Sequence, residues 1–277
     1  MNVLIPTDFS DNSWNAINYA LHLLKNVEVT FFILHVSNAN EYTVLDEATN
    51  DLAVTNASKN QTVEDQLSLL KNRILSESKN KKHTYNFGIE YNSFIKTLRA
   101  QIVAKQIDLI IMGTKGVSGI KKYLLGSNAG DVITKVKCPV LVIPEKARYE
   151  TPLQIAFPTD YNISYNKRVL KTLKTITGLH NSSLEIVHVG IKKLPLTTEQ
   201  KKNKTILSKS IEELQHSFNT CNCLNLEDTI QQFVEKKEIN IIAMVAKNLN
   251  FFQRILFKPN IEKVSFQTET PFLVLHE

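Results

Sequence analysis

"MGTKGVSGIKKYLLGSNAGDVITKVKCPVLVIP", residues 112–144, holds five of the chain's eight glycines. The stretch starts at the end of an apolar strand, passes through a glycine-marked loop, and continues into a helix over residues 128–136 and a second strand, "PVLVIP". Two strands joined through a helix lie parallel in one sheet, and such sheets belong to α/β proteins. The stretch therefore predicts an α/β fold with a parallel sheet.

The residues before this stretch alternate in the same way. Apolar or alternating runs predict three more strands, "VLIP" (3–6), "VTFFILHV" (29–36) and "HTYNFGIEY" (83–91), and the strand that leads into the glycine loop is "DLIIMG" (108–113). Between them, apolar residues recur at helical spacing in three groups: Trp14, Ile17, Leu21 and Leu24; Val63, Leu67, Leu70 and Ile74; Ile95, Leu98 and Ile102. The pattern predicts five parallel strands with helices between them.

Helix starts and loops are predicted from polar residues. Thr62 and Asp65 are spaced as a capping pair for the second helix, and Ser93 precedes the third. The segment from Ser37 to about Asn60 is long and polar, so we expect a mobile loop or lid there.

The second half of the chain repeats the first. "NVLIPTDFSDNSWNAINYALHLL" from Asn2 aligns with "QIAFPTDYNISYNKRVLKTLKTI" from Gln154, and "MVAKNLNFFQRILFKPNIEKVSFQTETPFLVLHE" from Met244 aligns without a gap with the stretch from Met112. A short polar linker, "EKARYETP" (145–152), separates the halves. We therefore predict two tandem domains, residues 1–147 and 152–277, each an open parallel five-stranded sheet flanked by helices.

Composition limits the classes of protein to which the chain can belong. Of its 277 residues 43% are hydrophobic and 22% charged, as in water-soluble globular proteins. Three cysteines give no paired disulfide framework, no signal peptide is evident and no apolar run is long enough to cross a bilayer, so we expect a cytoplasmic protein without a membrane partner. The net charge of +6 comes from scattered lysines without interleaved aromatic residues. This pattern argues against nucleic acid as a partner.

The glycine loop has two readings that the residues alone leave open. Gly116 can adopt a positive φ and turn its N–H inward, and Ser127 is placed to cap the following helix. Free N–H groups at a helix start attract a phosphate. The other reading is that these glycines serve only turns and caps.

The spacing Gly113-x2-Gly116-x9-Gly126-Ser127 resembles that of the ATP-binding branch of the universal stress protein family. The resemblance extends over the whole chain as a tandem pair of domains, and includes "PTD" after the first strand and the terminal "CPVLVIP". It implies a five-stranded parallel sheet between helices, with the last strands paired across a two-fold or pseudo-two-fold axis. Such pairing can join two chains in a homodimer, or the two halves within one chain.

The resemblance also implies a site for an adenine nucleotide, ATP or AMP, and leaves open whether Mg²⁺ accompanies it. Asp8 and Val36 would hold adenine and ribose, and Met112 and Gly113 would flank the ribose. The full set of implied site residues is Pro6, Thr7, Asp8, Val36, Met112, Gly113, Gly116, Gly126, Ser127 and the backbone of Asn128. Asp8 has a structural alternative, since Asp160 is retained at the matching position of the second half, and an Asp after a strand often caps the next helix.

The second half lacks the glycines of this site. Gly113, Gly116, Gly126 and Ser127 are matched by Val245, Asn248, Lys258 and Pro259. Val245 adds bulk and Pro259 removes an N–H donor. We therefore expect the second half to keep the fold without the nucleotide site.

Three functions remain open. The first is a regulator of the stress response that binds one nucleotide per chain in its first half. The second is an interaction scaffold in which the glycine loop is structural. The third is a weak ATPase, for which we expect at most slow hydrolysis and assign no catalytic or metal-binding residue, because no P-loop, Ser/His/Asp arrangement or metal-ligand spacing is present.

Overall fold

The computed structural model describes residues 1–37, 51–114, 127–163, 165–190, 195–222, 226–246 and 269–276. The elements of the first half are β1 (Asn2–Thr7), α1 (Asp11–Leu23), β2 (Val29–Ser37), α2 (Asp51–Glu77), β3 (His83–Tyr91), α3 (Phe94–Ala104), β4 (Leu109–Thr114), α4 (Ser127–Lys135) and β5 (Val140–Pro144). Those of the second half are β6 (Gln154–Thr159), α5 (Lys167–Gly178), β7 (Ser183–Gly190), α6 (Thr198–Ser210), β8 (His216–Asn222), α7 (Leu226–Lys236), β9 (Ile241–Val245) and β10 (Phe272–Leu275).

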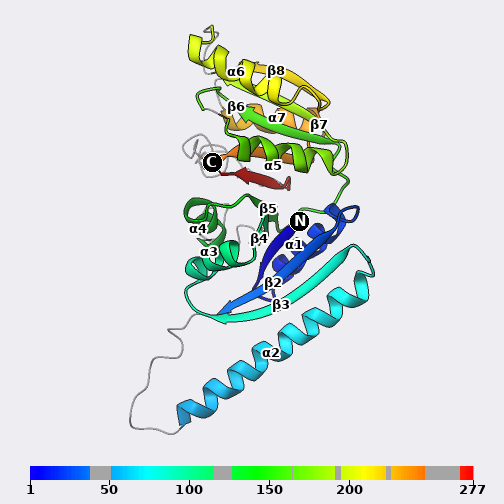
Figure 1. Cartoon of the computed structure of the whole chain (residues 1–277), viewed down its shortest axis with the longest axis vertical. Coiled ribbons are helices and arrows are strands. Elements are labelled where there is room, and N and C mark those ends of the chain that lie inside the picture. The colour runs from blue at the N-terminus through cyan, green and yellow to red at the C-terminus, as the bar shows by residue number, and fades with distance from the viewer. Residues whose placement is uncertain are drawn as a thin grey trace.

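One sheet of ten strands runs through both halves in the order β3-β2-β1-β4-β5-β10-β9-β6-β7-β8 (Figure 1). Within each half all neighbouring strands are parallel, and the order is the same in both. The halves meet where β5 and β10 pair antiparallel, with Leu141 opposite Leu273. The predicted α/β class is confirmed, and the last strands pair within one chain.

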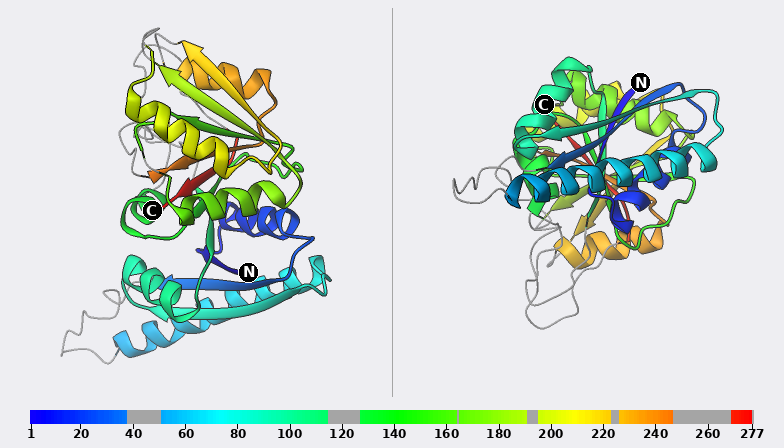
Figure 2. Two further views of the ribbon diagram at one scale, coloured as in Figure 1. Left: turned by 45° about the horizontal axis from the view of Figure 1, so that its top comes forward. Right: turned by 90° about the horizontal axis from the view of Figure 1, so that it is seen from below.

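Helices cover both faces of the sheet (Figures 1 and 2). The side chains of α1, α2, α5 and α6 pack into the buried cluster on one face, and those of α3, α4 and α7 pack into the cluster on the other. Leu141 and Leu273 belong to the same cluster, so the apolar core continues across the seam between the halves. The division at residues 147 and 152 stays a prediction.

Helix α1 follows from its sequence. Its N-cap is Ser10, whose Oγ accepts a hydrogen bond from the Ser13 N–H at 3.3 Å. Ile17, Leu21 and Leu24, three of the predicted stripe, are buried. The cap and the stripe fix where the helix starts and which face meets the sheet.

Helix α2 begins earlier than predicted. It runs from Asp51, so Thr62 and Asp65 lie inside the helix and the predicted capping pair there is wrong. The predicted loop over Ser37 to Asn60 is therefore helical from Asp51, and residues 38–50 lie outside the described part. Leu70 and Ile74 are buried as expected. The polar residues that precede Thr62 have no apolar stripe, but a helix propagates cooperatively from a packed turn without needing one.

The other predicted caps differ from the structure in detail. Ser93 is the N-cap of α3, but its side chain makes no capping hydrogen bond. Helix α4 starts at Ser127, one residue before the predicted start, so Ser127 is the first helical residue. The side chain of Ser127 lies outside the described part, and its predicted capping bond stays untested.

Candidate functional site

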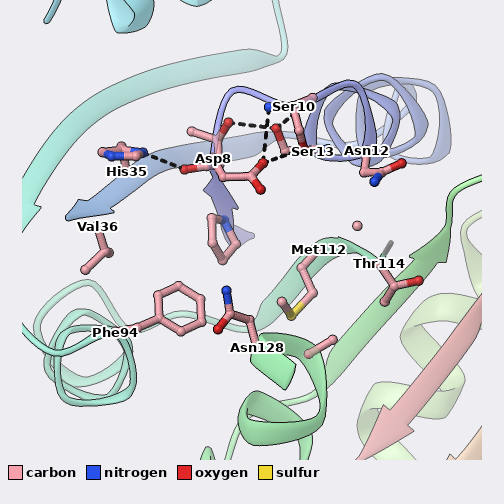
Figure 3. Close-up of a pocket in the computed structure, with 14 residues that line it drawn as sticks. Asp8, Ser10, Asn12, Ser13, His35, Val36, Phe94, Met112, Thr114 and Asn128 are labelled. Atoms are coloured by element: carbon pink, nitrogen blue, oxygen red, sulfur yellow. Dashed lines mark hydrogen bonds between the residues drawn. The ribbon is translucent and has the colours of Figure 1, made fainter. Parts of the chain in front are cut away.

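A pocket of about 330 Å³ opens at the carboxyl ends of β1, β2 and β4 (Figure 3). Beyond β1 the chain places β2 and β3 on one side, and β4 and β5 on the other. This reversal is the topological switch point, where open α/β sheets bind ligands. The volume lies at the lower end of the roughly 300–1,000 Å³ that is typical of small-molecule sites.

Seven of the ten predicted site residues line this pocket: Pro6, Thr7, Asp8, Val36, Met112, Gly113 and Asn128. They come from three strands and the start of α4, so residues far apart in the sequence meet here. Gly116 and Gly126 lie outside the described residues. Of Ser127 the structure describes the backbone alone, at the start of α4.

The pocket also has walls that the sequence did not indicate. The residues missed are Ser10, Asn12 and Ser13 at the start of α1, His35 on β2, Phe94 at the start of α3, Thr114 on β4 and Ala129 on α4. The residues at helix starts could have been predicted, since every helix that follows a parallel strand begins at the edge of the sheet where that strand ends. Phe94 directly follows the Ser93 cap, and that position alone could have placed it.

Asp8 anchors the turn between β1 and α1. Its Oδ1 accepts hydrogen bonds from the N–H of Ser10, at 3.1 Å, and from the Ser10 hydroxyl. Burial would raise the pKa of Asp8, but hydrogen bonds from Ser10 and Ser13 outweigh it and hold the pKa below 3.8. Asp160 accepts the same backbone bond from Asn162 at 2.9 Å. Asp8 thus has a structural role that recurs in the second half, and Ser10 rather than Asp8 is the cap.

Asp8 should make folding more sensitive to acid. A carboxyl whose folded pKa is depressed stabilises the fold above its unfolded pKa, here about 3.8, and loses that contribution as the pH falls through its folded pKa. We expect the Asp8→Asn variant to unfold more readily than the parent at neutral pH by less than about 1 kcal/mol, because the carboxylate is exposed. The difference in unfolding free energy between the parent and the variant should shrink below about pH 4, as measured by urea unfolding at a series of pH values. A gap that stays constant across this range would contradict the assignment.

An aromatic residue in the left-handed region completes the turn. Phe9 has φ 63°, and its N–H donates to Thr7 Oγ1 at 3.1 Å. Its ring stacks on His35, with centroids 4.6 Å apart. The His35 ring in turn donates from Nδ1 to the Thr7 carbonyl at 2.9 Å. These contacts join the ends of β1 and β2, and so fix the floor of the pocket.

The walls suit a ligand with one flat apolar part and one anionic part. Val36, Phe94 and Met112 bring apolar groups to the pocket, and Asp8, Thr114 and Asn128 bring polar groups (Figure 3). The start of α4 also borders the pocket, and a helix start favours a negative charge. Among the described residues, no group of three or more His, Cys, Asp or Glu side chains is placed to hold a metal ion.

The turn that follows the first strand recurs in the second half, after β6. Tyr161 also has a positive φ, 56°, and stacks on His188, as Phe9 stacks on His35. Tyr161 is only 1% exposed. Helix α6 covers this turn, since Gln200 donates to the Asp160 carbonyl at 2.9 Å and Asn203 to the Tyr161 carbonyl at 2.8 Å. The turn is thus retained and held by α6, with Tyr161 buried and Asn162 exposed.

The comparisons with known proteins agree with this fold. A family model described as the universal stress protein family matches residues 1–144. Universal stress protein MJ0577 of Methanocaldococcus jannaschii is 33% identical over 161 residues, which is 52% of this chain and 94% of the relative. Universal stress protein MJ0531 of the same organism is 31% identical over 143 residues, covering 51% of this chain and 80% of the relative.

A solved structure is similar to the chain over its full length. The universal stress protein of Archaeoglobus fulgidus matches with a TM-score of 0.63 and 17% identity, covering 99% of this chain and 98% of that one. At this identity the likeness shows the fold alone. Within the described part, no helix is both long and apolar enough to cross a membrane. From the family match to its first half, together with the identities to these relatives, the chain belongs to the universal stress protein family.

Proposed function

We propose that the first half binds one adenine nucleotide, ATP or AMP, and that the protein acts as a nucleotide-dependent regulator of the stress response. The observation that carries the proposal is the pocket at the switch point, which is lined by seven of the ten site residues that the family resemblance implies. Its position follows the general rule for open α/β sheets, and its apolar and polar walls suit a base and phosphates.

In this proposal the roles follow the chemistry of the walls. Asp8 and Val36 hold the adenine and ribose, with Pro6 and Thr7 beside them, and Met112 and Gly113 flank the ribose. The start of α4, with Asn128, lies toward the phosphates, and Gly116, Gly126 and Ser127 complete that side. In this proposal the second half stays without nucleotide, because the buried Val245 stands at the position of Gly113, and Pro259 at that of Ser127 lacks an N–H donor.

Titration of the purified chain with ATP and with AMP tests the proposal. We expect one site per chain, and a rise in the unfolding free energy of about 2.7 kcal/mol at a nucleotide concentration 100 times the Kd. Guanosine triphosphate serves as the control for the base, and inorganic triphosphate as the control for the phosphates alone. Absence of heat and of a thermal shift at millimolar ATP and AMP would contradict the proposal, and would favour a scaffold in which the glycine loop is structural.

A further inference from the structure

Gly113 lies at a very close approach between β4 and the first turn of α1. A Cβ atom added to Gly113 would lie 2.8 Å from the carbonyl carbon of Asn12 and 3.4 Å from the amide nitrogen of Ser13, and nearest of all to the Asn12 carbonyl oxygen. Real Cβ atoms essentially never come within 3.0 Å of another heavy atom. The atoms in the way belong to the backbone, so a change of side-chain rotamer cannot relieve the clash.

The second half has a valine at the same place in the sheet. Gly113 pairs with Ile143 of β5, and Val245 pairs with Leu275 of β10, which are matching positions. Val245 is only 4% exposed, so its side chain takes up buried space. A first turn placed as in α1 would collide with that side chain.

The helix of the second half starts one turn later. Helix α1 begins at Asp11, four residues after β1 ends at Thr7, whereas α5 begins at Lys167, eight residues after β6 ends at Thr159. The N-cap moves accordingly from Ser10 to Asn166. The later turns stay in step, because Ile17 and Leu21 match the buried Val169 and Leu173. The starts of the two helices therefore differ by one turn, while the turns that carry these buried residues keep the same register.

We propose that Gly113 is a positioning residue: its missing side chain lets the first turn of α1 form against β4, and that turn brings Ser10, Asn12 and Ser13 to the pocket. Valine at this position excludes the turn and delays the helix start, as in the second half. That this turn contributes to ligand affinity rests on the proposed function. That Gly113 is needed for the turn to form does not depend on any ligand.

The first test uses the nucleotide-free chain and the Gly113→Val variant. Trp14, the only tryptophan, lies in this turn, and the Arg73 guanidinium lies 3.6 Å from its ring centroid. We expect red-shifted Trp14 emission, and amides from Trp14 to Ala16 that exchange at least about tenfold faster, while amides of β1 and β4 keep their protection. If the valine variant does not fold, Gly113→Ala is read in the same way, since its Cβ alone meets the same backbone. The control is Gly130→Val, at a glycine with nothing within 4 Å of an added Cβ.

The second test is a double-mutant cycle read by thermal unfolding. Residues 10–14 are replaced by the sequence of residues 162–166, Asn-Ile-Ser-Tyr-Asn, with and without Gly113→Val. Coupled sites give non-additive effects, so we expect Gly113→Val to lower Tm much less in the swapped chain than in the parent. Equal drops in both backgrounds, or a first turn of unchanged protection in the Gly113 variants, would overturn the proposal. A changed turn in a chain that binds no nucleotide even as wild type would overturn only the proposed function.

Discussion

A Leu273→Ala chain is expected to lose about 2–5 kcal/mol of unfolding free energy, because the change removes a fully buried side chain and leaves a cavity. Leu273 lies opposite Leu141, where β10 and β5 pair across the seam. The buried cluster around it contains residues of both halves. The loss should therefore be felt in the first half too, although the substitution is in the second.

Trp14 gives a direct measurement of that coupling. It is the chain's only tryptophan and lies on α1 in the first half, so its fluorescence during urea unfolding follows that half alone. We expect the Trp14 transition of Leu273→Ala to move to lower urea. Leu153→Ala is the matched control, since Leu153 is 58% exposed and its loss should change the free energy by less than about 0.5 kcal/mol. An unmoved Trp14 transition in Leu273→Ala would mean that the halves unfold independently.

Asn128→Asp is expected to weaken ATP binding by about 10- to 100-fold, since it places a carboxylate beside the expected phosphates at nearly unchanged shape. The same change should leave the nucleotide-free protein unharmed or more stable by about 0.3–1 kcal/mol, because an acid in the first turn of α4 complements the helix dipole. AMP, with fewer charges, should lose less affinity than ATP. Added salt should reduce the difference in ATP affinity between variant and parent, because position 128 is exposed and the charge of the introduced aspartate would be screened.

Asn128→Asp is expected to weaken ATP binding without lowering the stability of the nucleotide-free protein. A loss of affinity in this variant can therefore not be attributed to unfolding. Asn260→Asp is the matched control, because Asn260 aligns with Asn128 in the half that we expect to bind no nucleotide. Calorimetric titration of both variants, with thermal unfolding of each alone, completes the comparison. Equal loss of ATP affinity in the two variants, or no loss in Asn128→Asp, would show that the phosphates do not lie at the start of α4.

The fold was largely predictable because the central strands β1, β4 and β5 are almost entirely buried and therefore consist of apolar runs. The runs "VTFFILHV" and "HTYNFGIEY" also form strands as expected, β2 and the edge strand β3. The helix boundaries were less predictable. The start of α2 at Asp51 is set by propagation from the turns that carry Leu70 and Ile74, and the polar residues before Thr62 carry no signal of their own.

The late start of α5 shows a further limit. Asn162 and Asn166 are both good N-cap residues by type, and the alignment of the two halves has no gap there. Which of the two asparagines becomes the N-cap depends on Val245, a residue on another strand. The local sequence around α5 therefore cannot predict where the helix starts. The candidate site was predictable only in part, because several of its residues are brought to the pocket by tertiary packing. Pro6 and Met112 follow from a motif and its strand ends, whereas Ser13 and Phe94 reach the pocket through the packing of their helices.

The most direct test of one nucleotide site per chain is to release whatever co-purifies with the protein by acid precipitation, to identify it by mass spectrometry, and to count moles per mole of chain. We predict one adenine nucleotide per chain, held in the first half. Two per chain would contradict the expectation that the second half, with Val245, Lys258 and Pro259 in place of Gly113, Gly126 and Ser127, lacks the nucleotide site. No nucleotide, followed by no binding when ATP or AMP is added, would contradict the nucleotide site itself.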